Sequence, residues 1–178
     1  MSKSFLLLIL ICVESFVFAQ NQDNQLYEEV IRFDNGKIKA IIGLNELDKR
    51  EGITYEYYPN GLLFKETTYL NDIKEGLEIT YFQNGRIASK GIFINGLAEG
   101  EFIHYYKNGT PFASLYFYHD LLITAKNCFT SKGEIAYCGL IKAGNGVFLK
   151  YDKKGKIISK DYYKNGKFVR TENVEILE

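Results

Sequence analysis

The chain has 178 residues, with 22 basic and 22 acidic side chains, 14 tyrosines, 13 phenylalanines and no tryptophan. This length suits one domain. A net charge of zero, with no basic run longer than Lys153-Lys154, argues against nucleic-acid binding, because nucleic-acid binders usually carry a basic face.

Residues 1–19 have the pattern of a secretory signal peptide. Lys3 precedes an apolar run over residues 5–13, and the small residues Val17 and Ala19 stand three and one positions from the end of the segment. The sequence therefore predicts cleavage after Ala19. The mature protein is expected to be exported, whether periplasmic, at the cell surface or secreted.

Two alternatives fit this segment less well. A membrane anchor needs about 20 apolar residues, and Glu14 interrupts the run before that length. A lipoprotein signal at Cys12 is disfavoured because Ile11, directly before it, is larger than such a signal tolerates.

The next segment, residues 20–31, is predicted to be a cap or a loose tail at the start of a repeat array over residues 32–172, and residues 173–178 form the corresponding C-terminal tail. The array is visible in glycines that follow Asn or Lys at steps of 25, 24, 24, 24 and 22 residues. These turn glycines are Gly36, Gly61, Gly85, Gly109, Gly133 and Gly155.

The spacing divides the array into six units, at residues 32–56, 57–80, 81–104, 105–128, 129–150 and 151–172. The second and third units share seven identities in 24 columns without a gap. Most units also have a second turn eleven positions after the first, as at Asn71-Asp72, Asn95-Gly96 and Asn165-Gly166. Asn-Gly favours tight hairpins, because these turns need positive φ.

The segments between the turns are rich in β-branched and aromatic residues and are too short for helices. We therefore expect an all-β fold in which tandem β-hairpin repeats form one elongated, twisted antiparallel sheet of about twelve strands, as in solenoids.

The repeat resembles the MORN repeat variant found in bacterial YwqK-family antitoxins. The resemblance lies in Tyr-Tyr-x-Asn-Gly at residues 57–61 and 105–109 and in Asn-Gly-x-x-x-Gly at residues 95–100, and it extends over residues 32–172. It implies hairpins joined into an elongated antiparallel sheet, and a module that interacts with proteins or associates with membranes.

The fifth unit departs from the pattern. Lys132-Gly133 replaces Asn-Gly, and residues 143–146 replace the second turn, so an irregular hairpin is expected. Cys128 and Cys138 flank the first of these turns. Their side chains share a sheet face if the residue numbers of two paired positions in this hairpin add up to an even number. They point to opposite faces if the sum is odd. A disulfide and two unpaired thiols both remain open.

No catalytic constellation is apparent, and we expect neither enzyme activity nor a cofactor. His104 and His119 lie in different columns of the repeat, which disfavours a metal or acid–base site. His104 is expected to be solvated, and His119 takes the place of a turn asparagine. Ser114 and Ser131 have no partner base at motif spacing.

Three glutamates, Glu51, Glu75 and Glu99, recur directly before a glycine and are expected to form a row along one rim of the sheet. Neighbours in this row are two strand spacings apart, roughly 10 Å, which is too far to share one cation. We expect a solvated row that pairs with nearby lysines such as Lys49 and Lys74.

Aromatic residues recur in two adjacent columns and form the candidate binding surface. The columns are Tyr57, Tyr81 and Tyr105, and Tyr58, Phe82 and Tyr106. Adjacent residues of a strand point to opposite faces, so one column can be buried while the other is exposed. Stacking of the rings across strands and an exposed stripe for a partner are both open interpretations.

The sequence thus predicts an exported, non-catalytic repeat protein that acts as a protein-interaction or cell-envelope scaffold module. One alternative is an antitoxin or immunity protein that neutralises a toxin. Another is a carbohydrate-binding module, although the lack of tryptophan counts against it. Self-association through the end strands is also possible, because an unpaired edge is a template for pairing.

Overall fold

The computed structural model describes residues 26–152 and 154–174. The predicted signal peptide, residues 1–19, lies outside this part of the chain. The described residues form strands, turns and loops without a helix, which confirms the all-β prediction. The thirteen strands are β1 Tyr27–Arg32, β2 Ile38–Leu44, β3 Gly52–Tyr57, β4 Leu63–Leu70, β5 Ile73–Tyr81, β6 Ile87–Ile94, β7 Leu97–Tyr105, β8 Pro111–Tyr118, β9 Leu121–Lys126, β10 Gly139–Lys142, β11 Asn145–Tyr151, β12 Ile157–Lys164 and β13 Lys167–Asn173.

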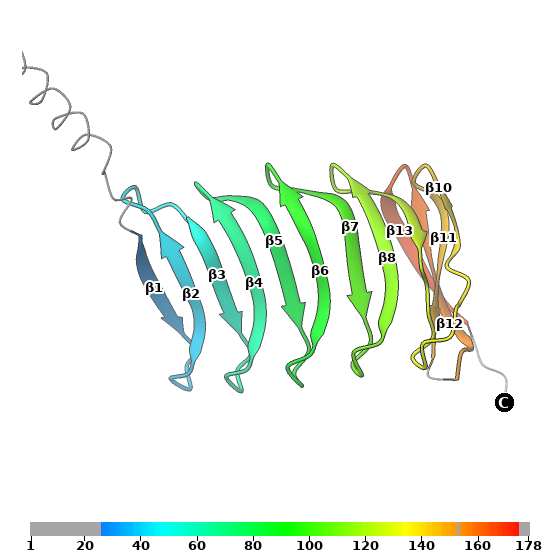
Figure 1. The fold of residues 1–178 in the computed structure, drawn as a ribbon, viewed down its shortest axis with the longest axis horizontal. Helices are drawn as coiled ribbons and strands as arrows, with labels where there is room; N and C mark the ends of the chain where they lie inside the picture. Colours follow the sequence, from blue (N-terminus) through cyan, green and yellow to red (C-terminus); the bar gives the residue numbers. More distant parts are fainter. Residues whose placement is uncertain (1–25, 153, 175–178) are drawn as a thin grey trace, which may run out of the picture.

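The strands follow one another in chain order, and each pairs antiparallel with the next within its sheet. Strands β1 to β9 make a nine-stranded sheet, and β10 to β13 make a four-stranded sheet at the C-terminal end (Figure 1). The predicted hairpin architecture is therefore confirmed. The division into two sheets differs from the single sheet of about twelve strands expected from the repeat.

The additional strand and the division into two sheets each have a local cause. The additional strand, β1 (Tyr27–Arg32), lies largely within the segment predicted to be a cap or a loose tail, and it forms the outer strand of the long sheet. The division falls at residues 127–138, where the chain forms only the isolated bridge between Phe129 and Ile135. The irregularity expected in the fifth unit is thus at its start.

Each unit is built from two kinds of turn, which lie on opposite rims of the sheets. The first kind has three loop residues, as where the Tyr58 amide donates to the Leu62 carbonyl over 2.8 Å and the Gly61 amide donates to the Tyr58 carbonyl over 2.8 Å. All six predicted turn glycines occupy the corresponding position, with φ between 78° and 92°. Glycine adopts this left-handed conformation without the steric cost that a β-carbon brings.

The second kind of turn has two loop residues with positive φ, as at Asn95 (50°) and Gly96 (83°). This geometry matches the twist of antiparallel strands. In the fifth unit, where residues 143–146 replace the usual turn sequence, the second turn is nevertheless regular. Lys142 pairs with Asn145, and Ala143 (φ 47°) and Gly144 (φ 77°) form the same tight turn.

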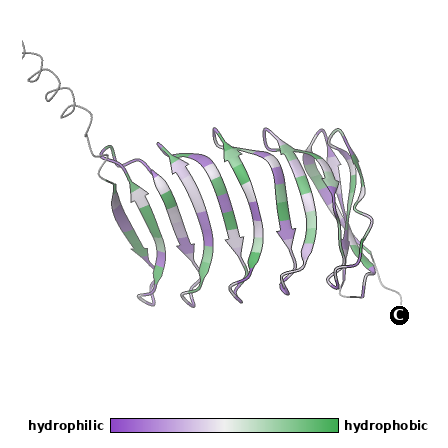
Figure 2. Ribbon diagram, in the orientation of Figure 1, coloured by the Kyte–Doolittle hydropathy of each residue, from purple (hydrophilic) through white to green (hydrophobic). Residues whose placement is uncertain are grey.

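The alternation of side chains along each strand gives the long sheet two different faces. One, which we call the closed face, carries most of the buried side chains of the sheet, among them Ala40, Thr54, Thr67, Tyr69, Ala98 and Ala113. The other, the open face, carries residues such as Ile53, Leu77 and Ile92, all of which are exposed. Polar and apolar residues are interspersed along most strands, as Figure 2 shows.

A glycine on the closed face makes room for an aromatic ring. Gly91 lies in the repeat column of Thr67 and Leu115, and a β-carbon there would lie 2.2 Å from the ring of Phe102. That ring packs edge-on against Phe93 and Phe117, with centroids 5.6 and 5.1 Å apart. Gly91 thus lets the aromatic cluster cross three strands.

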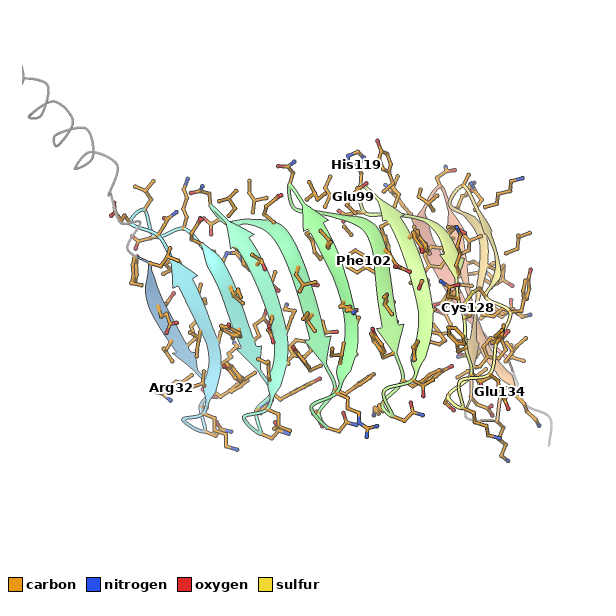
Figure 3. The ribbon with its side chains drawn as sticks, in the orientation of Figure 1. Arg32, Glu99, Phe102, His119, Cys128 and Glu134 are labelled. Carbon is orange, nitrogen blue, oxygen red and sulfur yellow. A yellow bond between two sulfur atoms is a disulfide. The ribbon has the colours of Figure 1, made fainter. Side chains whose placement is uncertain are left out.

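The hydrophobic core sits where the two sheets meet. Its buried members are Ala113, Leu122, Cys128, Ile141 and Phe148, which come from both sheets and from the irregular segment between them. Cys128 and Cys138 form a disulfide, with their α-carbons 5.3 Å apart. The bond ties the irregular segment to itself beside this core, and Cys128 is labelled there in Figure 3.

Candidate functional site

The glutamate row lies on the rim formed by the second turns, and each carboxylate binds the next unit. Glu75 Oε2 accepts a hydrogen bond from the Asn95 amide (2.7 Å), and Glu99 Oε2 accepts one from the His119 amide (2.9 Å). Glu51 Oε2 likewise accepts a hydrogen bond from the Asn71 amide (2.9 Å). In Figure 3 Glu99 and His119 appear together at this rim. The carboxylates therefore join consecutive turns.

This role differs from the predicted solvated row paired with lysines. Lys74 pairs with Glu78 instead, at 2.5 Å. Backbone bonds follow the same path, since the Gly96 amide donates to the Lys74 carbonyl (2.9 Å). The second turns at Asn71, Asn95, His119 and Asn165 thus each have two amides bound by the preceding unit, which makes this rim a structural element of the array.

Asparagines join the first turns on the opposite rim. Asn84 Nδ2 donates to the Lys107 carbonyl (2.7 Å), while Asn84 Oδ1 accepts from the Arg86 amide (3.1 Å). Asn108 repeats the first bond to the Ser131 carbonyl (2.7 Å). The side chain thus stabilises its own turn and binds the next one, which explains why Asn precedes glycine here.

One of the two candidate aromatic columns, that of Tyr58 and Tyr106, also makes contacts between units at this rim. The Tyr58 hydroxyl donates to the Tyr81 carbonyl (2.7 Å), and the Tyr106 hydroxyl donates to the Phe129 carbonyl (2.9 Å). Their rings pack against Phe64 and Phe112, with centroids 5.0 and 5.1 Å apart. These tyrosines connect neighbouring units, as the stacking interpretation supposes.

The third member of this column, Phe82, has no hydroxyl to make such a bond. Together with Tyr58 it lines a surface hollow of about 540 Å³ whose other walls are Gln83, Asn84 and Lys107. The hollow has an aromatic side and one basic group, but no buried polar side chain faces it among its lining residues.

The other column, Tyr57, Tyr81 and Tyr105, lies on the open face, and all three side chains are half-buried. The Tyr81 hydroxyl donates to Glu66 Oε1 on the neighbouring strand (2.6 Å). Burial, and secondarily this bond to a carboxylate, raise the pKa of Tyr81 to about 12. Tyr116 and Glu101 repeat the pair at 2.9 Å.

Toward the opposite end of the strands, the open face presents a patch of exposed aliphatic side chains. We call it the apolar patch, and its members are each 43 to 50% exposed: Ile53, Leu70, Ile73, Leu77, Ile92 and Ile94. Leu77 pairs directly with Ile92 across β5 and β6, and Leu70 pairs with Ile73 across the preceding turn. The patch therefore spans β3 to β6 at the end of the strands nearest the second turns.

Sequence reasoning missed the apolar patch because it followed aromatic residues. A usable signal was present, since Ile53 and Leu77 stand 24 residues apart, each directly after a Glu-Gly pair. Neither side chain makes the contacts that join the units, so their exposure has no structural explanation in the array. Exposed aliphatic groups that adjoin one another commonly mark an interaction surface.

The structure does not bring the histidines together into a site. His104 lies on the closed face, partly buried between Ser89 and Ala113, and burial lowers its pKa. The prediction that it is solvated is therefore wrong. His119 is exposed in its turn. Within residues 26–152 and 154–174, no group of three or more His, Cys, Asp or Glu side chains is arranged to hold a metal ion.

A second hollow, of about 370 Å³, adjoins the disulfide and includes Phe129, Ile135 and Tyr137 in its lining. Ile135 is 89% exposed. It belongs to the fifth unit, whereas the apolar patch lies on β3 to β6. In the part of the chain that the structure describes, no helix is long and apolar enough to cross a membrane.

These features define a tandem β-hairpin repeat protein with both rims occupied by contacts between units and one sheet face available. Three segments of the chain, residues 50–71, 74–95 and 145–165, match the MORN repeat variant. Each contains one hairpin around a first turn, namely β3–β4, β5–β6 and β11–β12. The predicted MORN repeats are thus confirmed at these three places. A comparison with curated proteins gave no significant match.

Proposed function

We propose that the protein is an exported, non-catalytic repeat module that binds another protein through the apolar patch on its open face. MORN repeats are commonly binding modules, which supports a binding role. The observation that carries the proposal is the patch itself, since Ile53, Leu77 and Ile92 are exposed while the rims and the closed face are engaged in internal contacts.

A protein is the partner whose chemistry suits this surface. The members of the patch are aliphatic, and the chain has no net charge to attract nucleic acid or anionic lipid. Tyr81 and Tyr116, whose hydroxyls bind glutamates, add ordered polar groups to the same face as the patch. Interfaces combine apolar centres with such polar rims.

Export is supported by two independent features. Residues 1–19 have a signal-peptide pattern, and Cys128 and Cys138 form a disulfide. Disulfides are rare in reducing compartments and common in exported proteins. Recovery of the oxidised, processed protein from the envelope or medium tests this part of the proposal, and a reduced protein retained in the cytoplasm contradicts it.

Binding is tested with the variant Leu77→Lys/Ile92→Lys, which places two charges in the apolar patch. Immobilised wild-type protein is expected to retain one protein at constant stoichiometry from envelope extract, and the variant is expected to lose it. Ile135→Lys is the matched control, since it charges an exposed aliphatic residue elsewhere. Retention of the same protein by both variants would show that the patch is not the binding surface.

The identity of the retained protein also distinguishes the antitoxin alternative. An enzyme or pore whose toxicity is relieved by this chain favours an immunity role. A structural component of the envelope favours a scaffold.

A further inference from the structure

The outer strand of the long sheet, β1, has one free edge. All six of its residues are exposed, and among the residues that the structure describes it pairs only with β2 (Figure 1). The Phe33 amide donates to the Lys37 carbonyl, so Phe33 faces β2. The direction of the backbone N–H and C=O groups alternates along a strand, so these groups of Tyr27, Glu29 and Ile31 also point toward β2. The backbone groups of Glu28, Val30 and Arg32 therefore point outward.

An independent bond supports this assignment. The Glu51 amide donates to the Gly43 carbonyl, which places Gly43 toward β3. Ala40 is an odd number of residues from Gly43, so its backbone groups point toward β1, where its partner is Ile31. The unpaired N–H and C=O groups on the free edge form a template for another strand.

We propose that two copies of this chain pair antiparallel through β1, about a two-fold axis at Val30, and so join two nine-stranded sheets into one. A symmetric antiparallel pair must place outward-facing residues opposite one another. With Val30 opposite Val30 of the second copy, Glu28 stands opposite Arg32, and Arg32 stands opposite Glu28.

Charge selects this register over its neighbours. An axis at Glu28 or at Arg32 would place like charges opposite each other, and so would an axis at Glu29. An axis at Ile31 would place Glu28 opposite Asp34. Only the register centred on Val30 pairs the whole strand with opposite charges facing, and cross-strand opposite-charge pairs stabilise a sheet whereas like charges destabilise it.

The side chain of Arg32 is available for this contact. Arg32 is exposed, and its NH1 donates to the Gly36 carbonyl in the adjoining turn (3.0 Å), which leaves its other donors free. It appears at the first-turn end of β1 in Figure 3. The pairing uses the strand edge and leaves the open face exposed, so the inference does not rest on the proposed function.

Sedimentation equilibrium over a range of concentrations tests the pairing with two single variants of the purified protein. Glu28→Arg creates Arg opposite Arg in the pair, and Arg32→Glu creates Glu opposite Glu. Each variant alone is expected to dimerise at least about tenfold more weakly than the wild type, since two pairs change sign. In an equimolar mixture every facing pair is again Arg with Glu, so a heterodimer is expected to form about as well as the wild-type dimer.

Four results would overturn the proposal. One is a wild-type protein that stays monomeric at the highest concentration reached. Another is a dimer that neither substitution weakens, which would place the interface elsewhere. A third is the formation of open-ended polymers, which would indicate pairing of β1 with β13. The last is two folded single variants whose mixture forms no heterodimer. Circular dichroism of each variant shows that loss of pairing is not loss of folding.

Discussion

Glu75 binds the backbone amide of Asn95, 2.7 Å away and twenty residues further along the chain. The contact joins the carboxylate of one unit to the turn of the next, and the pairs Glu51 with Asn71 and Glu99 with His119 repeat it. In the last unit Asn145 Oδ1 takes the place of the carboxylate and accepts from the Asn165 amide (3.0 Å). The same relationship thus survives a change of residue type.

The variant Glu75→Ala is expected to lower the free energy of unfolding by about 1 kcal/mol, a magnitude typical of a side chain that caps backbone amides. Urea denaturation followed by circular dichroism measures the change. Glu46→Ala is the matched control, since the structure shows no hydrogen bond for that exposed side chain among the described residues. Equal stabilities of the two variants would contradict the structural role of Glu75.

Ala143 occupies a turn position that asparagine holds in three of the other units. Alanine at positive φ costs about 1 kcal/mol or more relative to residues that tolerate it. We expect Ala143→Asn to raise the melting temperature, and Asn165→Ala, the reverse change in the equivalent turn, to lower it. A melting temperature that falls with Ala143→Asn would show that the turn is held by something other than backbone preference.

The Tyr81 phenol predicts an alkaline limit to stability. Its folded pKa of about 12 lies above the unfolded value of 10, so the stabilisation is complete below pH 10 and is lost between about pH 10 and 12. Tyr81→Phe is expected to flatten the dependence of unfolding free energy on pH in this range. Spectrophotometric titration of the phenolates should show one fewer group ionising near pH 12, and an unchanged titration would contradict the assignment.

The disulfide between Cys128 and Cys138 closes a short loop at the junction of the sheets. Closing a loop of this length stabilises a protein by about 3 kcal/mol in the chain-entropy description. Cys128→Ala/Cys138→Ala is expected to lose about that amount in urea denaturation. Reductant should destabilise the wild type and leave the variant unchanged, and an equal response of both proteins would show that the bond is not the cause.

Much of the fold follows from the repeat. Glycine spacing and the Asn-Gly turns specify antiparallel hairpins, because few other residues adopt those backbone angles. The regular turn at Ala143 was not predictable in this way, since alanine carries no turn signal and the neighbouring stacked turns impose its conformation. The division between the sheets depends on packing around Cys128 and Phe148, which the repeat does not encode.

The candidate site was less accessible to sequence reasoning. Glu75 was recognised as part of a recurring row, but its partner is a backbone amide, which has no sequence signature. Tyr58 and Tyr81 stood out as aromatic, yet which rings are engaged depends on hydroxyl contacts such as Tyr58 with the Tyr81 carbonyl. The exposure of Leu77 and Ile92 depends on the absence of a covering layer.

The most direct test of the account is site-specific photo-crosslinking in living cells, with a photoreactive phenylalanine analogue in place of Leu77 on the open face. Ser89, on the closed face of the neighbouring strand, is the control position. We predict one discrete crosslinked protein from position 77 and none from position 89. Crosslinks of equal yield from both positions, or none from position 77, would contradict binding through the apolar patch.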